Sequence, residues 1–152
     1  SRSYEKLAAE LLPDAEFTAK ACPLFVPLVE NGYVDAGNPV TKLVIAEYLQ
    51  ELRDNNVDTL ILGCTHYPLI KRMIGEFMGD AVTLIDSGKV TAQATAAALE
   101  DLGLLNGRTA GGSAQFFVSD VPYEFARQAR MFLGEYAGSG DVPVERIAIE
   151  SY

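Results

Sequence analysis

The sequence has few of the residues from which disulfide frameworks and metal sites are built. Its 152 residues include only two cysteines, Cys22 and Cys64, a single histidine, His66, and no tryptophan. Two cysteines in a chain of this length do not make a disulfide framework, so we expect both to be free thiols. One histidine and no Cys-x-x-Cys or His-Glu-x-x-His spacing leave too few ligands for a zinc site, and no metal is expected.

Basic residues and long apolar runs are also scarce. Asp and Glu outnumber Lys and Arg by 21 to 12, which gives a net charge of −9. This excess repels a phosphate backbone, so no nucleic-acid partner is predicted. The apolar runs fall well short of the ~20 residues that a membrane span needs, and no signal-peptide pattern opens the chain. We therefore expect no membrane association and a cytoplasmic globular protein.

Short apolar runs typical of strands alternate with segments of helical periodicity. Strands are expected at residues 16–21, 58–62, 81–85, 115–118 and 144–149. Helices are expected at residues 1–12, 24–30, 39 to the Asp-Asn-Asn sequence at 54–56, 69–78, 91–105 and 122–133. Asn38 is expected to cap the helix that begins at Pro39, and Asn-Gly at 106–107 to end the helix at 91–105. This alternation predicts an α/β fold, with a mostly parallel sheet and helices on both faces.

The sequence Gly-Cys-Thr-His-Tyr-Pro at 63–68 directly follows the expected strand 58–62. Pro68 suits the first turn of a helix, so Cys64 is expected between the carboxyl end of a buried strand and a helix N-terminus. Open α/β sheets bind ligands at this edge, and a helix N-terminus favours the thiolate form of a cysteine. The alternative is that Cys64 is a small buried apolar residue. The position favours a catalytic thiol.

Two neighbours of Cys64 could assist it. His66, two residues on, could stabilise a thiolate or carry a proton, although a lone histidine is more often structural. Thr65 offers a hydroxyl and a backbone N–H that suit a substrate carboxylate or amine, and it could equally be a helix cap.

Other polar or thiol-bearing positions carry less weight. Cys22 precedes a proline and has no base near it in the sequence, so we predict a structural role. Glu30 stands at the end of an expected helix, where an acid opposes the helix dipole, so it could be held there for a reason, although a solvated surface acid is the more common case. The sequences Asp-Ser-Gly at 86–88 and Ser-Asp at 119–120 follow expected strands and are typical of helix caps.

With these residues in view, the chain resembles the aspartate/glutamate racemase family. Residues 62–69, Leu-Gly-Cys-Thr-His-Tyr-Pro-Leu, look like the family's second catalytic-cysteine motif, and residues 22–30, Cys-Pro-Leu-Phe-Val-Pro-Leu-Val-Glu, resemble its upstream helix segment. Residues 85–88 and 116–120 also resemble family sequences. The Gly-Cys-Thr-His-Tyr-Pro sequence resembles most the members that act on glutamate.

The resemblance implies cofactor-independent racemisation of glutamate by two cysteines on opposite faces of the α-carbon. Cys64 looks like the second of that pair, Thr65 and His66 resemble its substrate-binding and proton-assisting neighbours, and Glu30 is a possible supporting residue. The implied role is supply of D-glutamate for peptidoglycan and cell-wall synthesis.

The resemblance covers only part of such an enzyme. The family's Asp-Ser-Gly-x-Gly-Gly, Pro-Tyr-Gly and Cys-Asn-Thr-Ala segments are not found. We therefore expect the two-domain racemase fold in part only. Residues 1–86 would form one α/β domain without its leading strand, and residues 87–152 would return to complete the other. Such a chain is expected to be inactive alone, and to form a homo-oligomer or associate with the missing amino-terminal half.

Other functions remain open from the residues alone. Another racemase or a decarboxylase of the same family would share the thiol turn. A cysteine hydrolase could use Cys64 and His66, but it would need an orienting Asn or Asp and an acyl substrate. A non-catalytic chain that only holds the fold is the remaining alternative.

Overall fold

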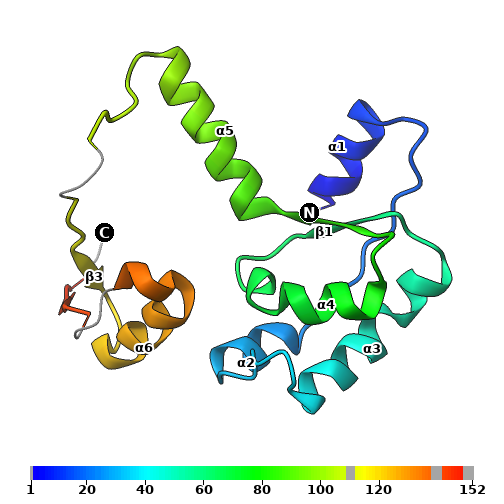
Figure 1. Cartoon of the computed structure of the whole chain (residues 1–152), viewed down its shortest axis with the longest axis horizontal. Helices are drawn as coiled ribbons and strands as arrows, with labels where there is room; N and C mark the ends of the chain where they lie inside the picture. The colour runs from blue at the N-terminus through cyan, green and yellow to red at the C-terminus, as the bar shows by residue number, and fades with distance from the viewer. Residues whose placement is uncertain (1, 109–111, 138–141, 149–152) are drawn as a thin grey trace. The chain divides into compact units, whose positions relative to one another are not determined.

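The computed structural model describes residues 2–108, 112–137 and 142–148, and it divides into two units. The first comprises Ser1–Val90 and the second Thr91–Tyr152, and each is considered by itself (Figure 1). The boundary falls inside helix α5 (Ser87–Asp101). That the chain contributes to two domains, divided after residue 86, remains a prediction.

The first unit is built around two parallel strands, β1 (Thr59–Leu62) and β2 (Thr83–Asp86), paired from Thr59 with Thr83 to Leu62 with Asp86. A parallel pair needs a crossover, and here it consists of the 3₁₀-helix η1 (Tyr67–Ile70) and helix α4 (Lys71–Met78). The expected strand at 58–62 is confirmed, and the one at 81–85 begins two residues later than predicted. The α/β class with parallel strands is confirmed.

The core of this unit lies where α2 (Phe25–Glu30), α3 (Pro39–Asp54) and α4 pack together (Figure 1). Each buried apolar side chain here contributes about 1.5–3 kcal/mol relative to exposure. The buried members are Phe25, Val29, Ile45, Leu49, Leu52, Leu62, Ile70, Met73, Ile74 and Met78.

Helix α3 begins as the sequence predicts. The Asn38 side-chain oxygen accepts hydrogen bonds from the N–H groups of Val40 at 3.0 Å and Thr41 at 3.1 Å, and Pro39 stands in the first turn. Thr41 is fully buried, and its hydroxyl donates to the carbonyl of Tyr33 at 2.7 Å. This bond ties the start of α3 to the turn that follows α2.

The predicted strand at residues 16–21 is wrong. The segment is not assigned to any strand or helix, and residues 16–21 are exposed. Its alternating sequence, Glu-Phe-Thr-Ala-Lys-Ala, is that of a half-buried strand. A strand requires a ladder partner, and among the described residues its amides donate no backbone hydrogen bond.

Helix α1 (Ser3–Leu11) corresponds to the helix predicted at 1–12 but has no buried residue. Its apolar side chains are largely exposed, with Tyr4 at 49%, Leu7 at 54% and Leu11 at 65%. Figure 1 shows α1 on the opposite side of the strands from α4. The Tyr4 ring lies 3.5 Å from the position that a Cβ would occupy on Gly63.

Helix α5 begins and ends four residues before the predicted range of 91–105. It starts directly after β2 because the Asp86 carboxylate accepts from the Lys89 N–H at 3.0 Å, which acts as a cap. It ends because Gly103 adopts φ +66° while Leu104 N–H donates to Leu99 and Gly103 N–H to Glu100. This is a Schellman motif, and Gly103, not the predicted Asn-Gly at 106–107, supplies the left-handed residue.

The second unit is a smaller β-α-β arrangement. Strand β3 (Phe116–Val118) pairs in parallel with β4 (Val144–Arg146), and α6 (Pro122–Leu133) and the 3₁₀-helix η2 (Gly134–Ala137) connect them. The predicted strand at 115–118 and helix at 122–133 are confirmed. The last predicted strand is present but shorter, and its residue 149 lies outside the described residues.

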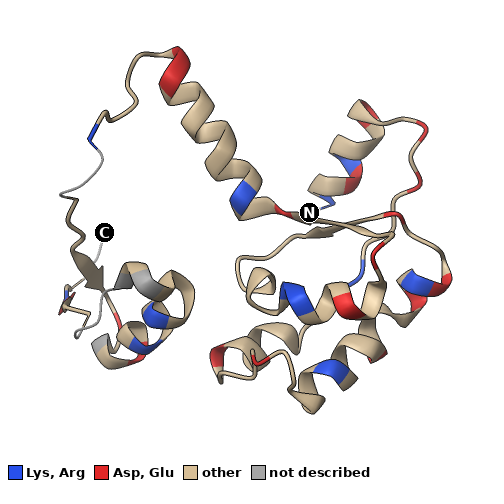
Figure 2. Ribbon diagram, viewed as in Figure 1, with Lys and Arg blue, Asp and Glu red and all other residues tan. Residues whose placement is uncertain are grey.

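Charges of both signs are interspersed on the ribbon of the first unit (Figure 2). Glu76 of α4 pairs with Lys42 of α3 and with Arg72 of its own helix, both at 3.1 Å. Hydrogen bonds from Lys42 and Arg72 lower the pKa of Glu76. These pairs are exposed, so each contributes little to stability. No helix among the described residues has the length and apolarity to cross a membrane.

Candidate active site

The thiol turn leaves the carboxyl end of β1. After Leu62, the Gly63 N–H turns back to the Ile61 carbonyl at 3.0 Å, and residues 64–66 form a bend that leads into η1. The Ser87 hydroxyl, at the end of β2, donates to the Leu62 carbonyl at 3.1 Å and so ties the two strand ends together. Cys64 is half-buried, with a free thiol.

The helix after this turn differs in detail from the prediction. Its first turn is 3₁₀ and begins at Tyr67, with Pro68 in the first turn and His66 as the N-cap residue. The cap has no side-chain hydrogen bond, so Thr65 does not act as the cap that the sequence allowed. The Thr65 hydroxyl lies 3.1 Å from His66 Nδ1 instead.

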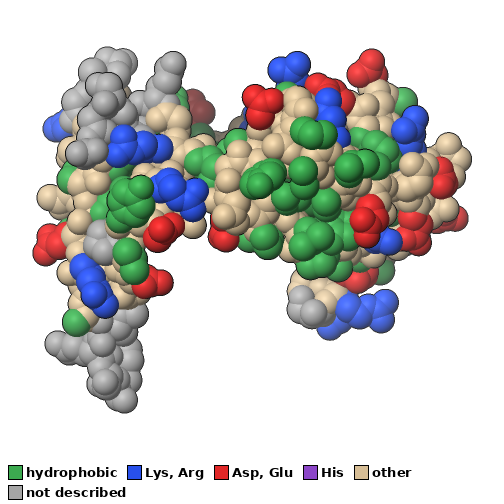
Figure 3. All heavy atoms as spheres, turned by 90° about the horizontal axis from the view of Figure 1, so that it is seen from below, with side chains coloured by type: hydrophobic (Ala, Val, Ile, Leu, Met, Phe, Trp, Pro, Cys, Tyr) green, Lys and Arg blue, Asp and Glu red, His purple; other side chains and the backbone are tan. Residues whose placement is uncertain are grey.

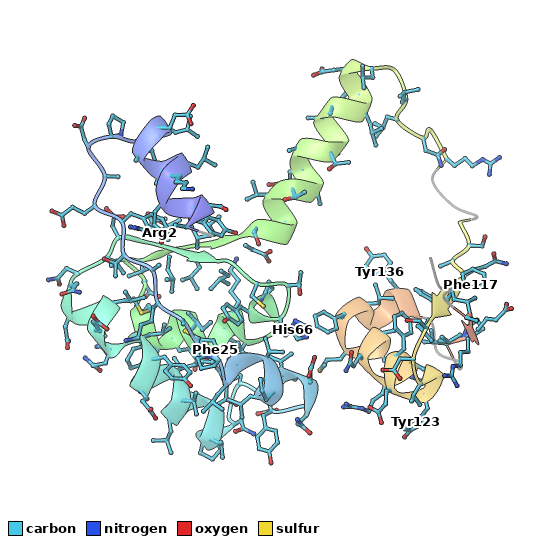
Figure 4. All side chains as sticks on the ribbon, turned by 180° about the vertical axis from the view of Figure 1, so that it is seen from behind. Arg2, Phe25, His66, Phe117, Tyr123 and Tyr136 are labelled. Atoms are coloured by element: carbon cyan, nitrogen blue, oxygen red, sulfur yellow. The ribbon has the colours of Figure 1, made fainter. Side chains whose placement is uncertain are left out.

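Glu30 and His66 meet although they are 36 residues apart in the sequence. His66 Nε2 lies 3.2 Å from Glu30 Oε1, and the two side chains are 20% and 39% exposed. Figure 4 labels His66 and Phe25 on the ribbon of the first unit. Glu30 ends α2, where its charge is unfavourable to the helix dipole, and the imidazole gives it a partner there. The structure thus links Glu30, His66 and Thr65 through side-chain contacts. Thr65 and His66 directly follow Cys64 in the sequence.

Aromatic packing holds α2 against the thiol turn. The Phe25 and Tyr67 rings meet edge-on, with centroids 5.2 Å apart, and the Tyr67 hydroxyl donates to the Cys22 carbonyl at 3.3 Å. Burial raises the pKa of Tyr67 to about 12, so this phenol remains a hydrogen-bond donor at neutral pH. These contacts fix the distance between Glu30 and the residues that follow Cys64.

Cys22 is a buried structural thiol in this arrangement. It is 6% exposed, and its Sγ lies 3.7 Å from the Lys20 carbonyl. Burial raises its pKa, and the charge of Lys20 opposes that effect only in part. This environment favours the unreactive, protonated form, in agreement with the sequence-based expectation.

No group of three or more His, Cys, Asp or Glu side chains within the described ranges could hold a metal ion. A half-exposed thiol is the candidate nucleophile or base, and a carboxylate-oriented imidazole two residues away is a candidate proton carrier. The fold and this site define a parallel α/β protein with its candidate reactive cysteine in the turn after a strand.

Comparison with known proteins identifies the family. The chain is 46% identical over 138 residues, 91% of its length, to the glutamate racemase of Geobacter metallireducens, and 41% identical over 134 residues to that of Chlorobaculum parvum. The structure of a glutamate racemase from Francisella tularensis, in complex with D-glutamate, matches 99% of the chain with a TM-score of 0.81 and 32% identity. That of the Thermus thermophilus glutamate racemase, in complex with beta-chloro-D-alanine, matches 86% with a TM-score of 0.73 and 43% identity. No protein-family model matches the chain.

The chain is therefore a homologue of the glutamate racemases and belongs to their family. It spans about half the length of the curated relatives, namely 50% and 48% of the two named above, and 54% and 47% of the two solved chains.

Sequence reasoning named Cys64, Thr65, His66 and Glu30 as candidate site residues, but not how they meet. The direct pairing of Glu30 with His66 was not predicted, because it joins the end of α2 to a turn 36 residues later. The only signal was an acid at a helix C-terminus. The contacts by which Tyr67 holds α2 were also not predicted, because nothing in the sequence next to this tyrosine indicates a distant partner.

Proposed function

We propose that the chain carries one of the two proton-transferring halves of a glutamate racemase, with Cys64 as its thiol base. The observation that supports this most is the free, half-buried thiol at the carboxyl end of β1 in a homologue of glutamate racemases. The activity of the whole enzyme is a proposal, since the chain matches only about half of each relative.

In the proposed mechanism, the Cys64 thiolate removes the α-proton from one face of glutamate and becomes a thiol. The planar carbanion then takes a proton on the opposite face from a second thiol, supplied by the part of a racemase that this chain does not match. A single thiolate could only return the proton it took, so inversion requires both groups. No cofactor is needed for this exchange.

His66, Thr65 and Glu30 assist Cys64 in this proposal. His66 stabilises the thiolate or relays its proton, and the hydroxyl and backbone N–H of Thr65 bind polar groups of the substrate. Glu30 is a positioning residue that holds the imidazole through the 3.2 Å contact. The D-glutamate formed would serve peptidoglycan synthesis, and the two free thiols suit the reducing cytoplasm.

A chimera tests the proposal. In it, this chain replaces the matching part of the Geobacter metallireducens glutamate racemase, and the interconversion of L- and D-glutamate is followed by circular dichroism. The chimera is expected to racemise glutamate in both directions, and the chain alone is expected not to. A folded chimera without activity would contradict the proposed function.

A further inference from the structure

One edge of β1 is unpaired and faces a cavity. In the parallel ladder, Thr83 N–H donates to the Asp58 carbonyl at 2.8 Å, so the backbone groups of Asp58, Leu60 and Leu62 face β2. Those of the alternate residues, Thr59 and Ile61, face the other way. Among the described residues, no backbone carbonyl accepts from either of these two amides. An unpaired edge of this kind is a ready template for another strand.

The cavity beside this edge has a volume of about 880 Å³. It lies between β1 and the extended segment 14–20, since both line it along their lengths. Its other walls include Phe25, Leu49, Leu52 and Ile74 from the core, and Tyr4 from α1. Cys64, His66 and Glu30 are not among its lining residues, although Gly63 and Tyr67, which flank the thiol turn, are.

The segment on the far side of the cavity also has the character of a strand. Residues 16–21 alternate polar and apolar side chains, yet their amides donate no backbone hydrogen bond among the described residues. Two strand-like segments therefore line the cavity, and both contain amides that donate no backbone hydrogen bond among the described residues. Neighbouring strands lie ≈ 4.8 Å apart, so a single further strand could bond to both.

We propose that this cavity binds one β-strand, which pairs with the open edge of β1 and with residues 16–21. The occupant is a segment from the part of a glutamate racemase that this chain does not match, which is about half of each relative. The apolar side chains on the core side call for a strand that is apolar on the face turned toward them. The placement explains why the predicted strand at 16–21 is extended but unpaired.

A small-molecule ligand is the rival occupant, because pockets of ≈ 300–1,000 Å³ commonly hold one. The row of outward amides along β1 favours a strand, since a compact ligand cannot pair with both Thr59 and Ile61 and also with residues 16–21. A strand would protect these amides from hydrogen exchange only when further polypeptide is present, whereas a small ligand would protect them in the chain alone.

Amide hydrogen exchange, resolved by residue with NMR, distinguishes them. In the chain alone, the amides of Leu60 and Leu62 should exchange slowly, and those of Thr59 and Ile61 rapidly. In the chimera defined above, Thr59 and Ile61 should slow by at least ~100-fold. The same protection is expected in a Cys64→Ala chimera, so the result does not depend on the proposed catalysis. Equal exchange in chain and chimera, or a chimera that does not fold, would overturn the proposal.

A substitution pair gives a second readout. Ile61→Pro removes an amide that β2 does not use, so the chain alone should tolerate it as an edge strand does. In the chimera it should lower the unfolding midpoint by ~5 °C or more beyond its effect on the chain alone. Ile61→Val keeps the amide and serves as the control. Equal effects of Ile61→Pro in both proteins, or protection of Thr59 and Ile61 by free glutamate in the chain alone, would contradict a strand as the occupant.

Discussion

The two thiols of this chain have different surroundings, and this difference decides which of them can do chemistry. Cys64 stands half-buried in the turn after β1, whereas Cys22 is 6% exposed and its pKa is raised by burial. Only the thiolate reacts at an appreciable rate. We therefore expect Cys64 to be the more reactive thiol, which stays a prediction.

Alkylation of the folded chain by iodoacetamide at mildly alkaline pH checks this assignment. Cys64 should be labelled faster than Cys22, by on the order of tenfold, because Cys22 is buried and burial raises its pKa. Peptide mass spectrometry at a series of times gives both rates, and the unfolded chain provides the control in which the difference should shrink. Faster labelling of Cys22 in the folded chain would show that the assignment is wrong.

His66 is expected to act on turnover more than on binding. In the chimera, His66→Asn removes the proton-carrying imidazole and should lower kcat by about 100-fold or more, with a smaller change in KM. Glu30→Gln should lower kcat less, because it alters the orientation of His66 and leaves the imidazole in place. Steady-state kinetics with both enantiomers measure this, and a His66→Asn enzyme with unchanged kcat would exclude a role in proton transfer.

At the scale of the elements, one helix cap and two side-chain hydrogen bonds to the backbone position the site. Asn38 starts α3, Thr41 holds the turn after α2, and Tyr67 fastens η1 to α2. Together these contacts place Glu30 opposite His66. Exposed pairs such as Lys20 with Glu51, at 2.6 Å, contribute little to this arrangement because solvent screens them.

The cap of α3 gives a test of stability. Asn38→Ala leaves the N–H groups of Val40 and Thr41 without their acceptor and should lower the free energy of unfolding by about 1 kcal/mol. Asn38→Asp keeps an acceptor oxygen and should cost almost nothing, which makes it the matched control. Urea unfolding of both variants at neutral pH measures the difference. Equal losses would mean that the cap contributes nothing measurable.

Tyr67 should make stability depend on pH in the alkaline range. Its pKa in the folded state is raised to about 12, above the value of ~10 for an unfolded tyrosine. The neutral phenol is thus favoured by folding, and its contribution is complete below pH ~10 and is lost as the pH rises toward 12. Since the side chain is only partly buried, the loss should be on the order of 1 kcal/mol. Urea titrations of the parent and of Tyr67→Phe across this range should show a larger loss in the parent, since Cys22 and the other groups that ionise there are common to both. An identical decline in both would contradict it.

Elements with local signals were predictable from the sequence, and those that depend on a distant partner were not. The cap at Asn38, the proline at 68 and the apolar run before Gly63 located α3, the helix after the thiol turn and β1. Residues 16–21 have the alternation of a strand but lack a ladder partner within the described chain, so pattern alone gave a wrong assignment. The end of α5 was missed because Leu-Gly at 102–103 already closes the helix, before the Asn-Gly at 106–107. The site residues were recognised by their motif, while the Glu30–His66 contact required the fold.

At the scale of the whole molecule, the chain leaves apolar surface without a partner. Leu7 and Leu11 of α1 are exposed, and so are Val40 at 45% and Leu43 at 72% on α3. Figure 3 views the molecule from the side on which α2 and α3 lie in Figure 1, and it shows apolar side chains gathered on the first unit. Exposed apolar surface of this kind favours association. We expect the chain to self-associate, or to bind the rest of a racemase when that is supplied.

The central claim is that Cys64 is one of the two proton-transferring thiols of a glutamate racemase. Its most direct test is the racemisation rate of the Cys64→Ser chimera beside that of the Cys22→Ser chimera. A serine hydroxyl is far too weakly acidic to act as the base, so Cys64→Ser should abolish racemisation in both directions. Cys22→Ser should retain most of the parent rate, since Cys22 is a buried structural residue. A Cys64→Ser chimera that interconverts L- and D-glutamate at near the parent rate would contradict the account.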